Sequence, residues 1–175
     1  FGAYVVAFLA GTYSDAAILL PLAAIGAAAV GLGVGLFVTR YREIFFGMLN
    51  LALSMVFYSL LEKLYAFTRG TDGIRVEMPA VAGQRLDRET YEWVMFGIAL
   101  VLAFVFAMLV RIYLASPMGQ ALSAIKTRET RLEFMGVPAK RVLLSAYVLS
   151  AFLGGMGGAI IAMTTRHVTP LLAYW

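Results

Sequence analysis

Residues 16–39 read AAILLPLAAIGAAAVGLGVGLFVT, a run of 24 residues that contains no Asp, Glu, Lys or Arg. At a helical rise of about 1.5 Å per residue, such a run is long enough to cross the roughly 30 Å hydrocarbon core of a bilayer. An open strand would leave backbone groups unpaired in lipid, and the alternating pattern of a β-barrel is absent. The stretch therefore predicts a transmembrane helix.

The same pattern recurs along the chain. The sequence of 175 residues is 62% hydrophobic and 14% charged, whereas a soluble domain has about 45–50% apolar and about 25% charged residues. We expect an all-α polytopic bundle with about five spans, forming one transmembrane domain over 1–175 that is a fragment truncated at both ends. The predicted spans are 1–13, 16–39, 44–66, 92–115 and 142–164.

The charged residues predict how the loops are oriented. The two long hydrophilic loops, 68–91 and 116–141, are separated by one span and must lie on opposite sides. If 40–43 shares a side with 111–141, that side carries eight basic and three acidic residues, net +5, against five basic and six acidic residues, net −1, on the other. An excess of Lys and Arg marks the cytoplasmic side, so 116–141 is predicted to be cytoplasmic and 68–91 periplasmic. This asymmetry explains the basic residues without nucleic acid as a partner.

Small residues predict where the helices pack. Gly31 and Gly35 in one span, and Gly154 and Gly158 in another, each have the small-xxx-small spacing that lets helix backbones approach closely. The competing interpretation of a glycine cluster is a dinucleotide-binding loop. Neither cluster completes G-x-G-x-x-G or follows a strand, so helix packing is the favoured interpretation.

Several kinds of site have no support in the sequence. The chain has no Cys and one His, which gives no basis for a thiolate or multi-histidine metal site. No lysine stands in a G-x-x-x-x-G-K-[ST] motif, so we expect this chain to bind no ATP and no other cofactor. Ionisable residues are missing from the middle of the spans, where proton- or sodium-coupled carriers usually keep some. Energy for any transport is expected to come from a partner.

Neutral polar residues within the spans are the remaining candidates for a solute path. Asn50, Ser54 and Tyr58 are spaced by four and share a helix face, while Ser145 and Ser150 lie in the last span. The first three are predicted to line a translocation path for a polar solute. The alternative is that they form hydrogen bonds between helices, as such residues commonly do in membrane bundles.

The cytoplasmic loop 116–141 carries strong helix signals. Ser116 followed by Pro117 is a favourable helix start, and Gly136 after a second short helical run over 130–135 is a C-cap signature. Within the first helix, Leu122 and Ile125 form an apolar stripe. We expect this stripe to be covered by a partner, either the lipid interface or a cytoplasmic protein.

The order of five short segments resembles one transporter family. SPMGQALSAIK at 116–126 and SAFLGGMGGA at 150–159, together with FGAY at 1–4, FFGMLNLA at 45–52 and GTDGI at 70–74, resemble the LivM-type inner-membrane permease subunits of branched-chain amino acid ABC importers. The resemblance covers nearly the whole chain, and members of that family are longer at both ends.

This resemblance implies specific roles. It implies a multi-pass protein of the bacterial inner membrane that works with separate ATP-binding subunits carrying ATP and Mg²⁺, a second permease subunit and a periplasmic solute-binding protein. By position it implies coupling to the ATP-binding subunit for Gly119, Ala124, Ile125, Glu129 and Gly136. It also implies docking of the periplasmic protein near Thr71, Asp72 and Gly73.

The resemblance leaves the substrate open among leucine, isoleucine, valine and related compounds such as amides, urea and aromatic acids. Two other functions stay possible on the residues alone. One is an ATP-independent channel or secondary carrier, and the other is a structural or enzymatic subunit of a larger membrane complex.

Overall fold

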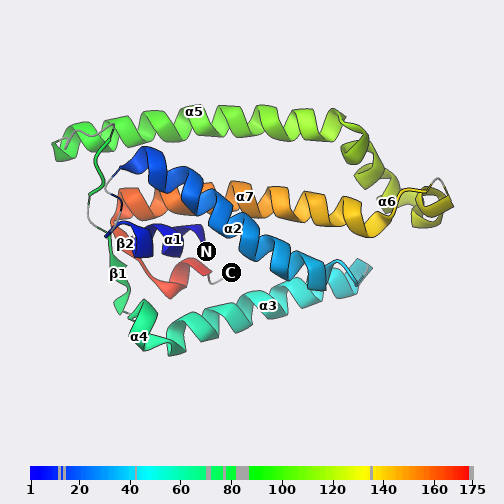
Figure 1. Cartoon of the computed structure of the whole chain (residues 1–175), viewed down its shortest axis with the longest axis horizontal. Helices are drawn as coiled ribbons and strands as arrows, with labels where there is room; N and C mark the ends of the chain where they lie inside the picture. The colour runs from blue at the N-terminus through cyan, green and yellow to red at the C-terminus, as the bar shows by residue number, and fades with distance from the viewer. Residues whose placement is uncertain are drawn as a thin grey trace.

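The computed structural model describes residues 1–11, 13, 15–41, 43–69, 72–76, 78–81, 87–134 and 136–173. Over these residues the chain is a bundle of long helices (Figure 1). Helix α6 (Pro117–Phe134) extends from one end of the bundle, and a pair of two-residue strands, β1 (Ile74–Arg75) and β2 (His167–Val168), lies at the opposite end (Figure 1). We refer to these as the α6 end and the β-pair end.

The core of the bundle lies where α2 (Ala16–Val38) and α7 (Ala139–Thr165) cross, with α1 (Gly2–Leu9) packed on both. Small residues make this packing close. Ala23, Ala24 and Ala159 are fully buried there, among larger side chains such as Leu19 and Met163. Small residues at helix crossings are typical of membrane proteins, where packing rather than exclusion of water drives association.

Helix α3 (Glu43–Lys63) ends three residues before the predicted span does, and a one-turn helix, α4 (Tyr65–Thr68), follows. The buried hydroxyl of Thr68 donates to the carbonyl oxygen of Leu64 at 2.9 Å and also lies within hydrogen-bond distance of the Leu61 carbonyl. The break therefore leaves these carbonyls satisfied, as the end of a helix in a membrane requires.

Helix α5 (Arg88–Ala115) runs along one side of the bundle (Figure 1). Tyr91 and Met95 are buried near its start, but a stripe of large apolar side chains along its length is more than half exposed. That stripe consists of Trp93, Phe96, Leu100, Val101, Phe104, Met108 and Ile112. A continuous apolar stripe of this size is unsuited to water and suits contact with lipid tails.

The loop 116–141 folds mainly as one continuous helix, α6 (Pro117–Phe134). The sequence predicted a separate second run over 130–135, and the structure joins it to the first, since 117–134 contains neither Gly nor Pro after Gly119 to interrupt it. Gly136 has φ of +79°, and the Val137 N–H donates to the Leu132 carbonyl oxygen at 3.2 Å. This bond is the 6→1 bond of a Schellman C-cap, as the glycine predicted.

The β-pair end joins two segments that are far apart in sequence. β1 (Ile74–Arg75) pairs antiparallel with β2 (His167–Val168), so that Ile74 lies opposite Val168 and Arg75 opposite His167. A short 3₁₀ helix, η2 (Pro170–Ala173), then turns back beside α3. The segment predicted as a loop therefore ties the end of α3 to the end of α7.

Among the described residues, four helices are long and apolar enough to cross a membrane: α2, α3, α5 and α7. They correspond to four of the five predicted spans. The remaining segment, 1–13, forms only α1, whose eight residues cover about 12 Å at 1.5 Å per residue. Its residues Gly2, Ala3, Tyr4 and Val6 are buried in the bundle, while Phe8 is exposed.

Candidate functional site: a neutral cavity between three helices

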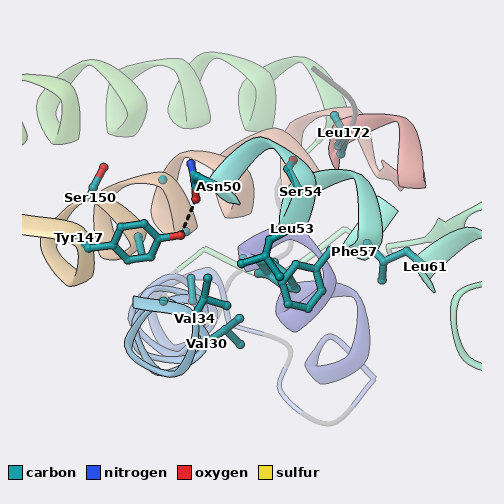
Figure 2. Close-up of a pocket in the computed structure, with 17 residues that line it drawn as sticks. Val30, Val34, Asn50, Leu53, Ser54, Phe57, Leu61, Tyr147, Ser150 and Leu172 are labelled. Carbon is teal, nitrogen blue, oxygen red and sulfur yellow. Dashed lines mark hydrogen bonds between the residues drawn. The ribbon is translucent and has the colours of Figure 1, made fainter. Parts of the chain in front are cut away.

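A cavity of about 440 Å³ lies between α2, α3 and α7 (Figure 2). Phe1 and Gly2, at the start of α1, and Leu172 of η2 also line the cavity. Its volume falls in the range of about 300–1,000 Å³ that is usual for sites of small molecules. None of the described residues that line it is Asp, Glu, Lys, Arg or His.

The wall is apolar on one side and polar on the other. Val30 and Val34 of α2 and Phe57 of α3 provide aliphatic and aromatic surface. The polar groups come from α3 and α7: Asn50, Ser54, Ser150 and Tyr147. Such a site is able to hold a small uncharged or zwitterionic solute through neutral hydrogen bonds, with its apolar part against the valines.

The polar side holds a hydrogen bond between two helices. The Tyr147 hydroxyl of α7 donates to Asn50 Oδ1 of α3 at 2.8 Å, as Figure 2 shows. The ring of Tyr147 also contacts Phe46 edge-on, with 6.3 Å between ring centroids. Asn50 therefore lines the cavity and also forms a hydrogen bond to a neighbouring helix. The sequence had left these two roles, lining a solute path and bonding between helices, as alternatives.

Of the three residues predicted to line a path, two reach the cavity. Asn50 and Ser54 line it, and Tyr58 is not among the lining residues. The reason is helical geometry: two steps of four residues rotate about 80° around a helix with 3.6 residues per turn. The lining residues of α3 also include Leu53, Phe57 and Leu61. Together with Asn50 and Ser54 they occupy an arc of about 100° that ends at Ser54, and Tyr58 lies about 40° beyond it.

The small-residue spacing brings α2 and α7 together, but not at every predicted glycine. A Cβ added to Gly31 would overlap the Cβ of Ala151, and one added to Gly35 would lie 2.9 Å from the side chains of Leu144 and Tyr147. On α7, a Cβ at Gly158 would lie 3.3 Å from the backbone of Ala3 in α1.

Gly154 does not make the contact that its spacing predicted. A Cβ there would meet nothing within 4 Å, because Gly154 lies on the cavity wall. The adjacent Gly155 makes the close contact instead, since a Cβ there would overlap the Cβ of Ala27. Both glycines line the cavity, but neighbouring positions on a helix differ by about 100°, so Gly155 packs against α2 while Gly154 is exposed.

The residues assigned to coupling lie in different environments around α6. Gly119 is buried at the corner between α5 and α6, where a Cβ would overlap the backbone of Leu114. Ser116 forms the predicted N-cap of this corner, accepting a hydrogen bond from the Gly119 N–H at 3.3 Å. Ala124 and Gly136 are exposed. The side chain of Glu129 lies outside the described residues.

The apolar stripe of α6 is covered by the chain itself. Leu122 and Ile125 pack in a small cluster with Leu132 of the same helix and Val142 of α7. The sequence left the lipid interface or a cytoplasmic protein as the partner of this stripe, and the structure shows the start of α7 there. Among the described side chains of α6, Met118, Ala124 and Phe134 are exposed apolar residues outside this cluster.

The predicted outer docking segment lies at the β-pair end. Asp72 is exposed and accepts a hydrogen bond from the Tyr65 hydroxyl at 3.1 Å. Gly73 is buried with φ of +68°, and a Cβ there would lie 2.6 Å from the Val168 carbonyl oxygen. Thr71 lies outside the described residues. Asp72 and Gly73 are thus held by α4 and β2, respectively.

Sequence reasoning missed Tyr147 as a lining residue and gave Ser150 no role in the cavity. Ser150 was identifiable as a polar residue within a span. Tyr147 carried no such signal, because an aromatic residue in an apolar helix is ordinary core and its partner Asn50 is 97 residues away in sequence.

Four apolar helices and a neutral, solute-sized cavity between three of them define a multi-pass membrane protein of the transport class. The chain belongs to the family described as branched-chain amino acid transport system / permease component, which it matches over residues 1–174. It is a multi-pass inner-membrane protein. The resemblance drawn from the five short segments is thereby confirmed.

Two curated relatives are similar to the chain. The high-affinity branched-chain amino acid transport system permease protein LivM of Salmonella typhimurium is 27% identical over 172 residues, and LivM of Escherichia coli is 26% identical over 172 residues. Each alignment covers 86% of this chain, and the chain spans about 40% of the length of each relative. No solved structure matches the chain significantly.

Proposed function

We propose that the chain is part of the transmembrane permease subunit of an ATP-driven ABC importer. It carries branched-chain or related small amino acids across the inner membrane. The family and the two LivM relatives support this class. The observation that carries the proposal within this chain is the neutral cavity between α2, α3 and α7.

The cavity chemistry suits such a substrate. A branched aliphatic side chain packs well against Val30, Val34 and Phe57, while Asn50 and Ser54 offer neutral hydrogen bonds to the polar end of the molecule. An uncharged wall also holds a zwitterion weakly, as a path that must release its solute requires.

In this proposal the α6 end lies in the cytoplasm and the β-pair end in the periplasm, as the distribution of Lys and Arg favours. Separate ATP-binding subunits hold ATP and Mg²⁺ and contact exposed residues of α6, among them Ala124. A second permease subunit completes the membrane part. A periplasmic solute-binding protein docks near Asp72. The chain itself performs no catalysis.

The test is uptake of radiolabelled leucine by cells that express the full-length protein with its neighbouring transport genes and lack other leucine uptake. Ser54→Leu narrows the cavity and is expected to reduce uptake at least about tenfold at low leucine, in line with the loss of a well-placed polar contact and added bulk. Val56→Leu is the matched control, because Val56 lies on the exposed face of α3 and outside the cavity lining.

The alternative function is an ATP-independent channel or carrier for a small polar solute, and Asn50 and Ser54 in a neutral cavity are the observation that favours it. Deletion of the ATP-binding subunits distinguishes the two functions. Uptake is expected to disappear if the importer proposal holds. Leucine uptake that persists without them selects the alternative.

A further inference from the structure

The cavity ends at one level on all three helices toward the α6 end. The lining residue nearest that end is Val34 on α2, Asn50 on α3 and Tyr147 on α7. In the next turns, Phe46 contacts the Tyr147 ring and Leu144 packs near Gly35. The side chain of Tyr147 therefore forms the floor of the cavity, reaching from α7 toward α3 as Figure 2 shows.

The same side chain connects two helices that otherwise contact each other little. Among the described elements, α3 packs mainly on η2 and only slightly on α2, and its contact with α7 is smaller still. The Tyr147 hydroxyl to Asn50 Oδ1 bond, at 2.8 Å, links α3 to α7 at the floor. A polar link between loosely packed helices is easily broken and remade, which suits a moving part.

The position of the ring depends on Gly35. A Cβ at Gly35 would lie 2.9 Å from both Tyr147 Cδ1 and Leu144 Cδ1, which is closer than normal van der Waals contact. The glycine therefore leaves the space that allows Tyr147 to lie across the floor. Any side chain there pushes the ring toward α3.

We infer that the hydrogen bond between Tyr147 and Asn50 is the inner gate of the cavity, which opens toward the α6 end when this bond breaks and α3 moves away from α7. The inference rests on the proposed function and adds to it the residues that close the path. Tyr147 and Asn50 act here as gating residues, and the space beside Gly35 accommodates the Tyr147 ring in the closed gate.

The test measures access to the cavity rather than uptake. Ser54→Cys places a thiol on the cavity wall of the full-length protein in membrane vesicles, in a background without other reactive cysteines. A membrane-impermeant maleimide is added to the face of the vesicles at which a separate Gln120→Cys variant is labelled, because Gln120 is exposed on α6. This choice of face is independent of the proposed orientation.

The gate variants are Tyr147→Phe, which removes only the hydroxyl, and Asn50→Leu, which removes the acceptor. Each is expected to speed labelling of Ser54→Cys by about threefold, which corresponds to the average strength of an interhelical hydrogen bond in a membrane protein. The double variant is expected to match the faster single variant, because both substitutions delete the same bond.

Tyr113→Phe is the matched control. It removes a hydrogen bond between α5 and α7 near the α6 end, in which the hydroxyls of Tyr113 and Ser145 lie 2.9 Å apart. Neither residue lines the cavity. Its labelling rate is expected to equal that of the parent. Ser150→Cys is a second reporter on the opposite wall.

Labelling that is equally slow in the parent and in both gate variants, at both reporters, overturns the gate. Strictly additive effects of the two gate substitutions overturn it as well, since they show that the residues act independently. Failure of the importer proposal is distinguishable, because it appears as uptake without ATP-binding subunits and leaves the labelling result unaffected.

Discussion

Gly31 of α2 lies so close to Ala151 of α7 that a methyl group added to the glycine would overlap the methyl group of the alanine. This contact sets how near the two central helices approach, and with them the width of the cavity that both line. Backbone proximity of this kind maximises packing contacts where no water is available to drive association.

The first prediction concerns this contact. Gly31→Ala is expected to lower the stability of the folded protein by about 1–3 kcal/mol, the usual penalty for overpacking a close contact. The measurement is thermal unfolding in detergent. Gly33→Ala is the control, because a Cβ at Gly33 meets nothing within 4 Å on the same helix. Combining Gly31→Ala with Ala151→Gly is expected to restore stability, and equal losses for the Gly31 and Gly33 variants contradict the account.

A second prediction concerns the corner between α5 and α6. A Cβ at Gly119 would overlap backbone atoms of Tyr113 and Leu114, which have no freedom to rotate away as a side chain does. Gly119→Ala is expected to displace α6 and expose the chain near Ser116 to thermolysin in limited proteolysis. Gly97→Ala serves as the control because its Cβ would meet open space on α5. Unchanged proteolysis of the Gly119 variant is the contradicting result.

A third prediction separates packing from partner contact on α6. Ile125 belongs to the cluster around Val142, whereas the neighbouring Ala124 is exposed. Ile125→Asp buries an unpaired charge and is expected to lower thermal stability by several kcal/mol. Ala124→Asp is expected to leave stability within about 0.5 kcal/mol and to reduce only binding of the ATP-binding subunits in co-purification. Equal stability of the two variants shows that the cluster does not hold α6.

A fourth prediction concerns orientation. Gln120 on α6 and Asp72 beside β1 lie at opposite ends of the bundle and are both exposed. In intact cells with a permeable outer membrane, an impermeant thiol reagent is expected to label Asp72→Cys and to leave Gln120→Cys unlabelled until the inner membrane is opened. Labelling of Gln120→Cys in intact cells reverses the proposed orientation and separates α6 from any cytoplasmic partner.

The long apolar segments were predictable because the lipid environment acts on each residue locally. The run 16–39 predicts a helix that the structure places at Ala16–Val38. The end of α6 shortly before Gly136 was also predictable, because the C-cap needs a residue with positive φ and glycine adopts it readily. Where a boundary was missed, at the end of α3, the cause is a hydroxyl of Thr68 that satisfies the freed carbonyls from outside the span.

By itself the amino-acid sequence determined that this chain is a helical membrane protein, which segments lie in lipid, and which family its ordered motifs resemble, since apolar composition and motif order are properties of the linear chain. Only the tertiary structure decided that Gly155 packs against α2 while Gly154 does not, that Val142 covers Ile125, and that Tyr147 meets Asn50. Each of these depends on the rotation of one helix about its axis relative to another. Rotation is set by the packing of the whole bundle, and a shift of one residue turns a side chain by about 100°.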